Sequence, residues 1–387
     1  MTLSVQLRCL IVAICCSGSI LAWQALTVHF SYRGNWTGLY WTSSSTPPPR
    51  TLAAELIHQI PRSPGYDGQF YHYIAHDPFF NRGLASSIDA PRLRYRRILV
   101  PVLAFLLAFG RDAAIDPAYL LVLSASVLLG AFWLSSLAVS LGRPALWGML
   151  FAIVPSVAIS ADRMTVDAAL ATCCVGFVLY QKQEKAYPLF CVLAAAALIR
   201  ETGLLLVAAW CLYLLGRRQI RHAAIFSMAA IPALCWYAFV YLNTGPDPVS
   251  FISPTLLTGF VSRVLTPFPY PFPGPVATLA KMLDLLALAG VAGAIAWTVR
   301  QALRRTWSPV AIALYLFAIL TITLAPGDPW SEVYAFGRTL TPLLLLASLD
   351  GLFAGSTLPL VAMLALTPRI GLQFGDQLLN ILRGLTS

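Results

Sequence analysis

One carboxylate followed by a group of arginines is the part of this sequence best suited to chemistry. Asp67 lies in the string YDGQFY at 66–71, where an aromatic-rich helix is predicted to begin. The positive end of the helix dipole favours an ionised carboxylate there, and a partly desolvated carboxylate gains basicity. Such a group could deprotonate an acceptor hydroxyl in a single displacement, with Tyr66, Gln69 and Tyr71 binding substrate beside it. A plain helix N-cap is the alternative role for Asp67.

The arginines follow about one short loop later, at Arg94, Arg96 and Arg97. A guanidinium offers forked donors that match the oxygens of a phosphate group, so these residues are predicted to bind a phosphate leaving group. The alternative is that their side chains only reach toward the membrane interface from an apolar segment.

Two histidines, His72 and His76, are spaced one helical turn apart on the same predicted helix. With Asp67 and Asp77 nearby, they leave a divalent-metal site open as an alternative. The simpler expectation is that both are solvated on the wet face of a surface helix. The sequence has no Gly-rich phosphate loop, no GxSxG and no HExxH, so it predicts no other cofactor.

The composition decides which class of protein must position these groups. The chain has 387 residues, of which 58% are hydrophobic and 11% are charged. Soluble domains carry roughly 25% charged residues, so a water-soluble fold is excluded. The net charge of +10 comes from basic residues scattered through short loops, as in membrane proteins, which argues against a nucleic-acid partner and for membrane lipids as the surroundings.

Hydropathy predicts an all-α, polytopic membrane protein of about 10–12 transmembrane helices. The segment 98–110 is short and carries Pro101 near its start, so it is expected to be re-entrant or interfacial. The candidate spans run approximately over 7–29, 117–141, 145–160, 164–180, 187–200, 202–215, 222–242, 278–299, 309–325, 338–354 and 357–367.

The distribution of basic residues among the loops predicts which loops lie on the cytoplasmic face of the membrane. If 98–110 does not cross, every strongly basic short loop falls on the side of the N-terminus, which the positive-inside rule makes cytoplasmic. The expected location is the inner (plasma) membrane of a bacterium. The opposite face then collects the first loop, 31–116, the stretch 326–338 and the proline-rich loop 244–277, which is expected to be a lid or a segment that faces the substrate. Within the first loop, 51–60 shows the pattern of an amphipathic helix lying on the membrane surface.

Four strings in this order resemble a known superfamily. They are YDGQFYHYIA, RYRRILVPVLA, DRMTVDAAL and LIRETGLLL, and together they are similar to the GT-C superfamily of polytopic glycosyltransferases. The likeness is greatest to the branch of the mannosyltransferases that assemble GPI anchors. The resemblance implies that Asp67 is the catalytic base and that the sugar donor is a polyprenyl phosphate. It also implies that the last two strings line the site, through Asp162, Arg163, Asp167, Arg200 and Glu201.

The sequence therefore predicts an inverting glycosyltransferase that uses a polyprenyl-phosphate-linked sugar on the non-cytoplasmic face. The acceptor would be a glycan, a lipid or a protein. A polymerase or ligase of surface polysaccharide, and a flippase of lipid-linked saccharides, are the alternatives. A flippase would use the same basic face for binding without bond cleavage, although no internal repeat of the kind many transporters show is evident.

Overall fold

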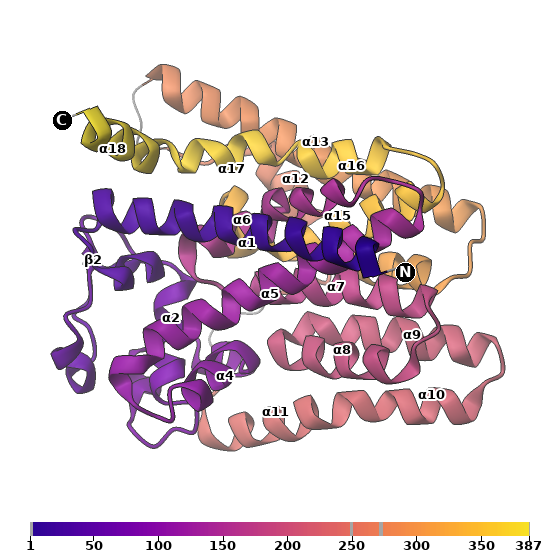
Figure 1. Ribbon diagram of the computed structural model, residues 1–387, viewed down its shortest axis with the longest axis horizontal. Coiled ribbons are helices and arrows are strands. Elements are labelled where there is room, and N and C mark those ends of the chain that lie inside the picture. The colour runs from indigo at the N-terminus through magenta and orange to yellow at the C-terminus, as the bar shows by residue number, and fades with distance from the viewer. Residues whose placement is uncertain (1–2, 248–250, 271–273, 387) are drawn as a thin grey trace.

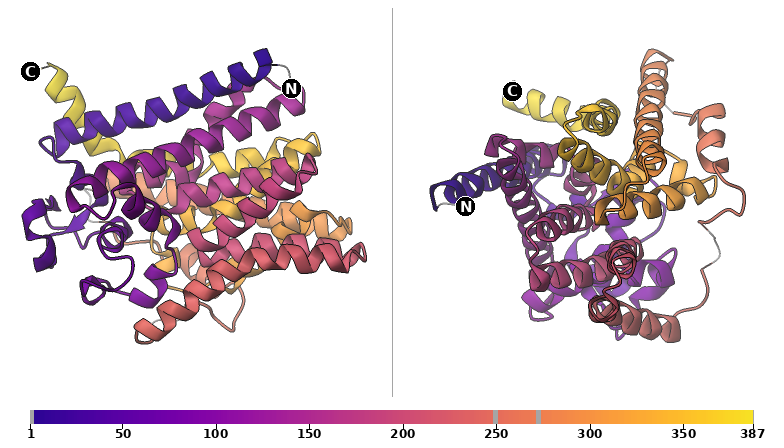
Figure 2. Two further views of the ribbon diagram at one scale, coloured as in Figure 1. Left: turned by 60° about the horizontal axis from the view of Figure 1, so that its bottom comes forward. Right: turned by 90° about the vertical axis from the view of Figure 1, so that its right-hand side faces the viewer.

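A computed structural model describes residues 3–247, 251–270 and 274–386 of the chain. It is an all-α protein in which long helices lie roughly alongside one another (Figure 1). The only two strands in the described part, β1 (Thr42–Ser43) and β2 (Gln59–Ile60), are two residues long and pair in parallel. The first loop gathers at one end of the bundle and the N-terminus lies at the other end (Figures 1 and 2).

Apolar runs set the long helices, and glycine, proline or a basic cluster ends most of them. The helices that precede the last third of the chain are α1 (Leu3–Ser31), α5 (Asp112–Ser140), η4 (Ala145–Ile153), α6 (Pro155–Arg163), α7 (Asp167–Lys182), α8 (Ala186–Ile199), η5 (Glu201–Gly203), α9 (Leu204–Gly216), α10 (Ile220–Ser227), η6 (Met228–Ala230) and α11 (Ile231–Asn243). They are followed by α12 (Thr258–Leu265), α13 (Gly274–Leu303), α14 (Pro309–Thr323), η7 (Asp328–Trp330), α15 (Val333–Phe353), α16 (Leu358–Leu364), α17 (Thr367–Gln373) and α18 (Gly375–Thr386).

The helices indicate an integral membrane protein. Among the described residues, four helices are long and apolar enough to cross a bilayer, or up to six if each of two bent pairs counts as one span. Three further apolar helices have 10–17 residues. The structure thus supports fewer full spans than the 10–12 expected, because several apolar segments form helices that are short or bent, such as η4 and α6, which meet at 57°.

The first loop is built from short elements instead of surface helices. These are η1 (Trp36–Tyr40), η2 (Arg50–Glu55), α2 (Asp67–His76), η3 (Leu84–Ser87), α3 (Pro91–Tyr95) and α4 (Leu99–Leu107). The prediction of an amphipathic helix over 51–60 is wrong: the helical turn ends at Glu55 and the chain becomes extended at Gln59. Leu56 has a left-handed backbone (φ 52°), which stops the helix despite the apolar spacing.

Helix α4 has nine residues, so it is about 14 Å long and cannot cross a hydrocarbon core of about 30 Å. Its outer side is apolar, and Leu106 and Phe109 at its end are exposed. A short helix with an exposed apolar side suits the expected interfacial or re-entrant segment, although its depth in a bilayer stays a prediction.

In the described part of the loop 244–277 lie the short helix α12, which ends before Pro267, and the first residues of α13. Pro271 and Pro273, part of the predicted proline run, lie outside the described residues. Two side chains of this loop, Arg263 and Tyr270, contact Asp284 of α13 at 2.5 and 2.7 Å, and Arg369 of α17 contacts the same carboxylate at 3.1 Å. The loop is therefore tied to the last third of the bundle through one buried carboxylate.

Close approach of two backbones fixes the position of α2. A Cβ on Gly68 would lie 2.0 Å from the carbonyl oxygen of Arg163 and 2.8 Å from that of Tyr40. Only glycine permits this contact, which places the first turn of α2 against the end of α6. The turn that carries Asp67 is thereby brought beside the turn that carries Asp162 and Arg163.

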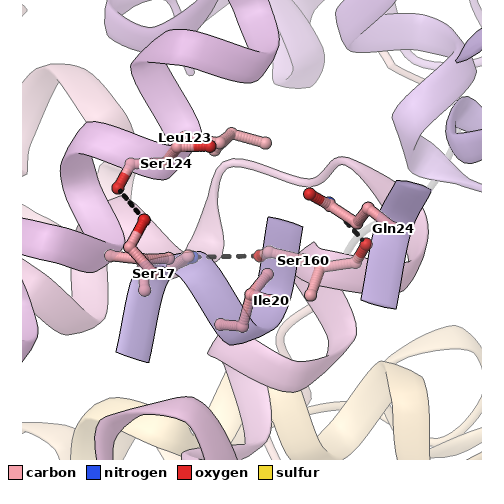
Figure 3. A pocket seen from close by; sticks show the side chains of 9 residues that line it. Ser17, Ile20, Gln24, Leu123, Ser124 and Ser160 are labelled. Atoms are coloured by element: carbon pink, nitrogen blue, oxygen red, sulfur yellow. Dashed lines mark hydrogen bonds between the residues drawn. The ribbon is translucent and has the colours of Figure 1, made fainter. Parts of the chain in front are cut away.

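A small polar crevice lies between α1, α5 and α6 (Figure 3). The Ser17 hydroxyl donates to the carbonyl of Ser124 at 3.1 Å, and the Gln24 amide donates to the carbonyl of Ala161 at 2.8 Å. These bonds fasten α1 to its neighbours. The bond from Gln24 holds the end of α6 in place. No charged side chain is among the residues that line the crevice, so these residues offer no group for acid–base chemistry or for binding phosphate.

Candidate functional site

Seven charged side chains from five parts of the chain meet next to the first turn of α2. We call them the arginine–carboxylate cluster: Asp67, Arg94, Arg97, Asp167, Arg200, Glu201 and Arg338. All but Arg338 were predicted as site residues from the sequence. Their convergence is the main outcome of the fold, because the segments that carry them are up to 271 positions apart in the chain.

Asp67 is the centre of the cluster. Its carboxylate forms ion pairs with Arg94 and Arg338, and the residue is 8% exposed. It occupies the first position of α2, whose N-cap is Tyr66, and no side chain caps that helix end by a hydrogen bond. The alternative role of Asp67 as a helix cap is therefore not realised in this structure.

The ionisation of Asp67 follows from these neighbours. Burial alone would raise the pKa of its carboxyl group, but Arg338 and then Arg94 outweigh burial and hold that pKa well below its ordinary value. The group is thus a carboxylate at any physiological pH, and a phosphate group that drew the two arginines toward itself would make this carboxylate more basic.

Arg97 is held on two sides. It makes a two-pronged bond to the Glu201 carboxylate, at 3.0 Å from Nε and 2.8 Å from Nη2, while its Nη1 donates to the Tyr71 hydroxyl at 2.9 Å. The side chain is almost fully buried. Arginine binds phosphate with the same forked geometry. Glu201 therefore occupies the position that a phosphate group would take on Arg97.

Asp167 begins α7 and joins the remaining arginines. It forms an ion pair with Arg200 and lies 3.7 Å from Nη1 of Arg338. Arg200 also donates to the Thr339 hydroxyl at 3.2 Å, one residue after Arg338. Helices α7 and α15 and the break between α8 and α9 are thereby locked together at the site.

Several buried polar atoms in the cluster lack a hydrogen-bond partner in the described part of the chain. They include Nε and Nη1 of Arg338, Nε of Arg200 and Oδ2 of Asp167. Buried polar groups are nearly always satisfied, so unused donors on two arginines point to a polar ligand. Arg94 also makes a two-pronged bond to the Asp89 carboxylate, so four guanidinium groups face four carboxylates. The unused nitrogens of Arg338 and Arg200 are the donors open to an anion.

The predicted pair Asp162 and Arg163 forms a neighbouring group. Arg163 contacts Asp162 at 2.7 Å, and its guanidinium lies 3.4 Å from the centre of the Trp41 ring. Asp162 also accepts hydrogen bonds from the Tyr334 hydroxyl at 2.7 Å and from the amide of Gln377 at 2.6 Å. Because the Asp162 carboxylate already has these three partners, it is less available for chemistry than that of Asp67. Asp162 and Arg163 instead support the wall of the site.

Tyr66 connects the two groups. Its ring lies 5.0 Å from the guanidinium of Arg338 and 6.1 Å from the ring of Tyr334. It therefore forms an aromatic wall next to Asp67, and its part in substrate binding stays a prediction.

Two predicted site residues lie elsewhere. Arg96 points to the ring of Tyr237 at 6.0 Å, outside the cluster, and Gln69 accepts a hydrogen bond from the backbone of Ser43 at 3.0 Å, which anchors β1. Arg92, from the same arginine group, donates to the backbone carbonyl of Thr244 at 2.5 Å. Arg94 and Arg97 are three positions apart, about one helical turn, so they share a side, whereas Arg92 and Arg96 point elsewhere.

Arg338 is the residue that the sequence did not single out. Its stretch, 326–338, is predicted to lie on the same membrane face, but an arginine at the start of an apolar segment carries no signal of its own.

A wide cleft of about 830 Å³ lies away from the cluster. Its lining residues include Lys182, Arg217 and Asp350, at the ends of α7, α9 and α15 opposite to the cluster. Comparisons of the chain with models of protein families, with curated proteins and with solved structures found no match.

Proposed function

We propose that the protein is an inverting glycosyltransferase of the membrane, which moves a sugar from a polyprenyl phosphate to an acceptor hydroxyl at the arginine–carboxylate cluster. The observation that carries the proposal is the placement of Asp67, a buried carboxylate between two arginines, with unused arginine donors beside it. A base and an anion site share one place, as a transfer from a phosphate-linked donor requires.

The reaction needs two tasks from these residues. Arg94, Arg97 and Arg338 would bind the donor phosphate and stabilise the negative charge that develops on it as the bond between the sugar carbon and the phosphate oxygen breaks. Asp67 would take the proton of the acceptor hydroxyl while its oxygen attacks that carbon from the opposite side. One displacement inverts the configuration and releases the lipid phosphate.

The carboxylates of the cluster fit this scheme because they hold the arginines in the absence of donor. Glu201 occupies the fork of Arg97, and Asp89 occupies that of Arg94. Asp67 pairs with the remaining nitrogen of Arg94 and with Nη2 of Arg338. A phosphate that competes for the same donors would exchange one set of charge-assisted bonds for another. The same exchange would free Asp67 to act as base.

The orientation belongs to the proposal as well. The basic loops that include Lys182 and Arg217 lie at the other end of their helices from Asp167 and Glu201. If those loops are cytoplasmic by the positive-inside rule, the cluster opens to the non-cytoplasmic side of a bacterial inner membrane.

The test is to incubate the purified protein in detergent or nanodiscs with a panel of polyprenyl-phosphate sugars and candidate glycan, lipid and peptide acceptors. We expect release of lipid phosphate with at least one donor and inverted configuration in the product. Movement of lipid-linked saccharide across proteoliposomes without bond cleavage would replace the enzyme with a flippase. Elongation of a polysaccharide would identify the polymerase or ligase alternative.

A further inference from the structure

A second cluster of ionisable groups lies on another side of α2, away from Asp67. It consists of Glu55 at the end of η2, His72 and His76 of α2, and Asp116 of α5, and we call it the histidine–carboxylate cluster. Each of the four offers one nitrogen or oxygen atom, and these four atoms lie within 4.8 Å of one another. The sequence had named the two histidines, but with Asp67 and Asp77 as partners and in a solvated setting, and both of those expectations are wrong.

The histidines are buried. His72 is 0% exposed and His76 is 1% exposed, because α2 packs against η1 and α5. The acids once expected nearby serve elsewhere: Asp67 pairs with arginines, and Asp77 accepts backbone hydrogen bonds from Asn81 and Arg82 after the end of α2.

The four atoms converge on one point. Nε2 of His72 lies 3.2 Å from Glu55 Oε1, 3.0 Å from Asp116 Oδ1 and 3.2 Å from Nε2 of His76. A single ring N–H can donate one good hydrogen bond, so three such neighbours exceed what it can serve. Ligands about 2.0–2.2 Å from a tetrahedral ion are separated by about 3.3–3.6 Å, close to these spacings.

The hydrogen bonding around the cluster is incomplete. Oε2 of Glu55, Nδ1 of His72 and Oδ1 of Asp116 have no hydrogen-bond partner within the described ranges. Oδ1 of Asp116 is 3.0 Å from His72, yet the angles are not those of a hydrogen bond. Of these atoms, Oδ1 of Asp116 faces Nε2 of His72 in the centre of the cluster without bonding to it, and a cation between them would satisfy both.

A second carboxylate orients His76. Its Nδ1 lies 2.8 Å from Oδ1 of Asp112, whose two oxygens lie 2.5 and 3.0 Å from Arg82. Histidine ligands of metals almost always donate their other ring N–H to a carboxylate or carbonyl, which fixes the tautomer. The bond to Asp112 leaves Nε2 of His76 free to coordinate. The ring of His72 is held flat against Tyr40, with centroids 4.2 Å apart.

We propose that Glu55, His72, His76 and Asp116 bind a divalent transition-metal ion, with Zn²⁺ as the best fit, and that the ion fastens η2 to α2 and α5. Two imidazoles favour Zn²⁺ over Mg²⁺ or Ca²⁺, which prefer oxygen ligands alone. Four protein ligands leave no position for substrate, so the ion is structural. This inference holds whatever reaction the arginine–carboxylate cluster performs.

The first experiment measures metal content by mass spectrometry of the full-length protein, purified in detergent without chelators. We expect one equivalent of zinc in the wild type. His76→Ala should fall to a tenth of that or less, whereas His222→Ala, at an exposed histidine, should keep the full equivalent. Zinc at equal levels in all three proteins would overturn the proposal.

A second experiment covers the case in which His76→Ala does not fold. The wild type is stripped with dipicolinate and titrated with Co²⁺, whose visible bands report four-coordination, and with Zn²⁺ while the melting temperature is followed. We expect the bands to appear at one equivalent and the melting temperature to rise with zinc, since a ligand of the native state stabilises it. Stripped protein that shows neither change holds an ordinary hydrogen-bond network and not a metal site.

Asp112→Asn distinguishes an orienting carboxylate from a merely structural one. It should bind zinc roughly 10–100-fold more weakly and still reach one equivalent at saturation. An unchanged affinity would remove Asp112 from the site, and complete loss of folding even at saturating zinc would assign it to packing alone.

Discussion

Helix α2 has two sides of opposite electrostatic character. On one, the carboxylate of Asp67 lies between arginines that hold its pKa below the ordinary value. On the other, burial would lower the pKa of His72, but Asp116 and Glu55 outweigh burial and raise that pKa to about 9. The first side has unused arginine donors and suits an anion, whereas the second has converging acceptors and suits a cation. One helix of ten residues thus presents the proposed base on one side and the proposed metal ligands on the other.

The largest effect in this comparison is expected from Asp67→Asn, which removes the proposed base and keeps its size. Turnover should fall by about 10²–10⁴-fold, as for other losses of a positioned acid–base group, with donor binding changed far less. The variant should retain its zinc, because that site uses another side of α2. Rates of sugar transfer per folded protein check the first point and metal analysis the second.

The matched control is Asp284→Asn. Asp284 is also a buried carboxylate between two arginines, Arg263 and Arg369, so its loss leaves the same kind of uncompensated charge. If both variants lose stability equally and only Asp67→Asn loses transfer, catalysis is separated from packing. Equal activity per folded molecule in the two variants would exclude Asp67 as base and turn attention to Asp167.

A smaller effect is expected from Arg97→Lys. Lysine keeps the charge but loses the fork that now grips Glu201, so affinity for the donor should fall by about 10–100-fold, or about 1.5–3 kcal/mol. The Michaelis constant for the donor measures this. Arg92→Lys is the control, because Arg92 belongs to the same short arginine run but bonds to Thr244 instead. Equal constants for both variants would assign Arg97 to anchoring.

The difference between the two sides also shows what the sequence could and could not reveal. An all-α membrane protein follows from apolar runs, and α2 follows from local spacing. Asp67, Arg94 and Arg97 were within reach because a carboxylate followed by a run of arginines stands out in an otherwise apolar sequence. The partner of Asp67 from the last third of the chain, Arg338, was not, since pairing across 271 positions depends on how helices pack.

The histidine–carboxylate cluster illustrates the same limit more sharply. The spacing of His72 and His76 is visible in the sequence, but Glu55 and Asp116 lie 17 and 44 positions from His72 in segments without a metal-type motif. Burial was misjudged because the two histidines were expected on the wet face of a surface helix, and 51–60 was expected to lie on the membrane. Instead, the chain turns at Leu56, which leaves Glu55 beside α2.

The smallest effect expected is a displacement of the pH profile in Arg338→Gln. Arg338 is the strongest of the influences that lower the pKa of Asp67, so its removal should raise that pKa by roughly 1–3 units. A base works only when ionised, and a lower pKa keeps it ionised to lower pH. The acidic limb of kcat/KM, which reports the free enzyme, should therefore lie below about pH 4 in the wild type and move upward in the variant. Arg369→Gln, which alters the pairing of Asp284 only, should leave the limb in place. A limb that stays put in Arg338→Gln would mean that the group titrating in catalysis is not Asp67, and the two sides of α2 would no longer divide into chemistry and fastening.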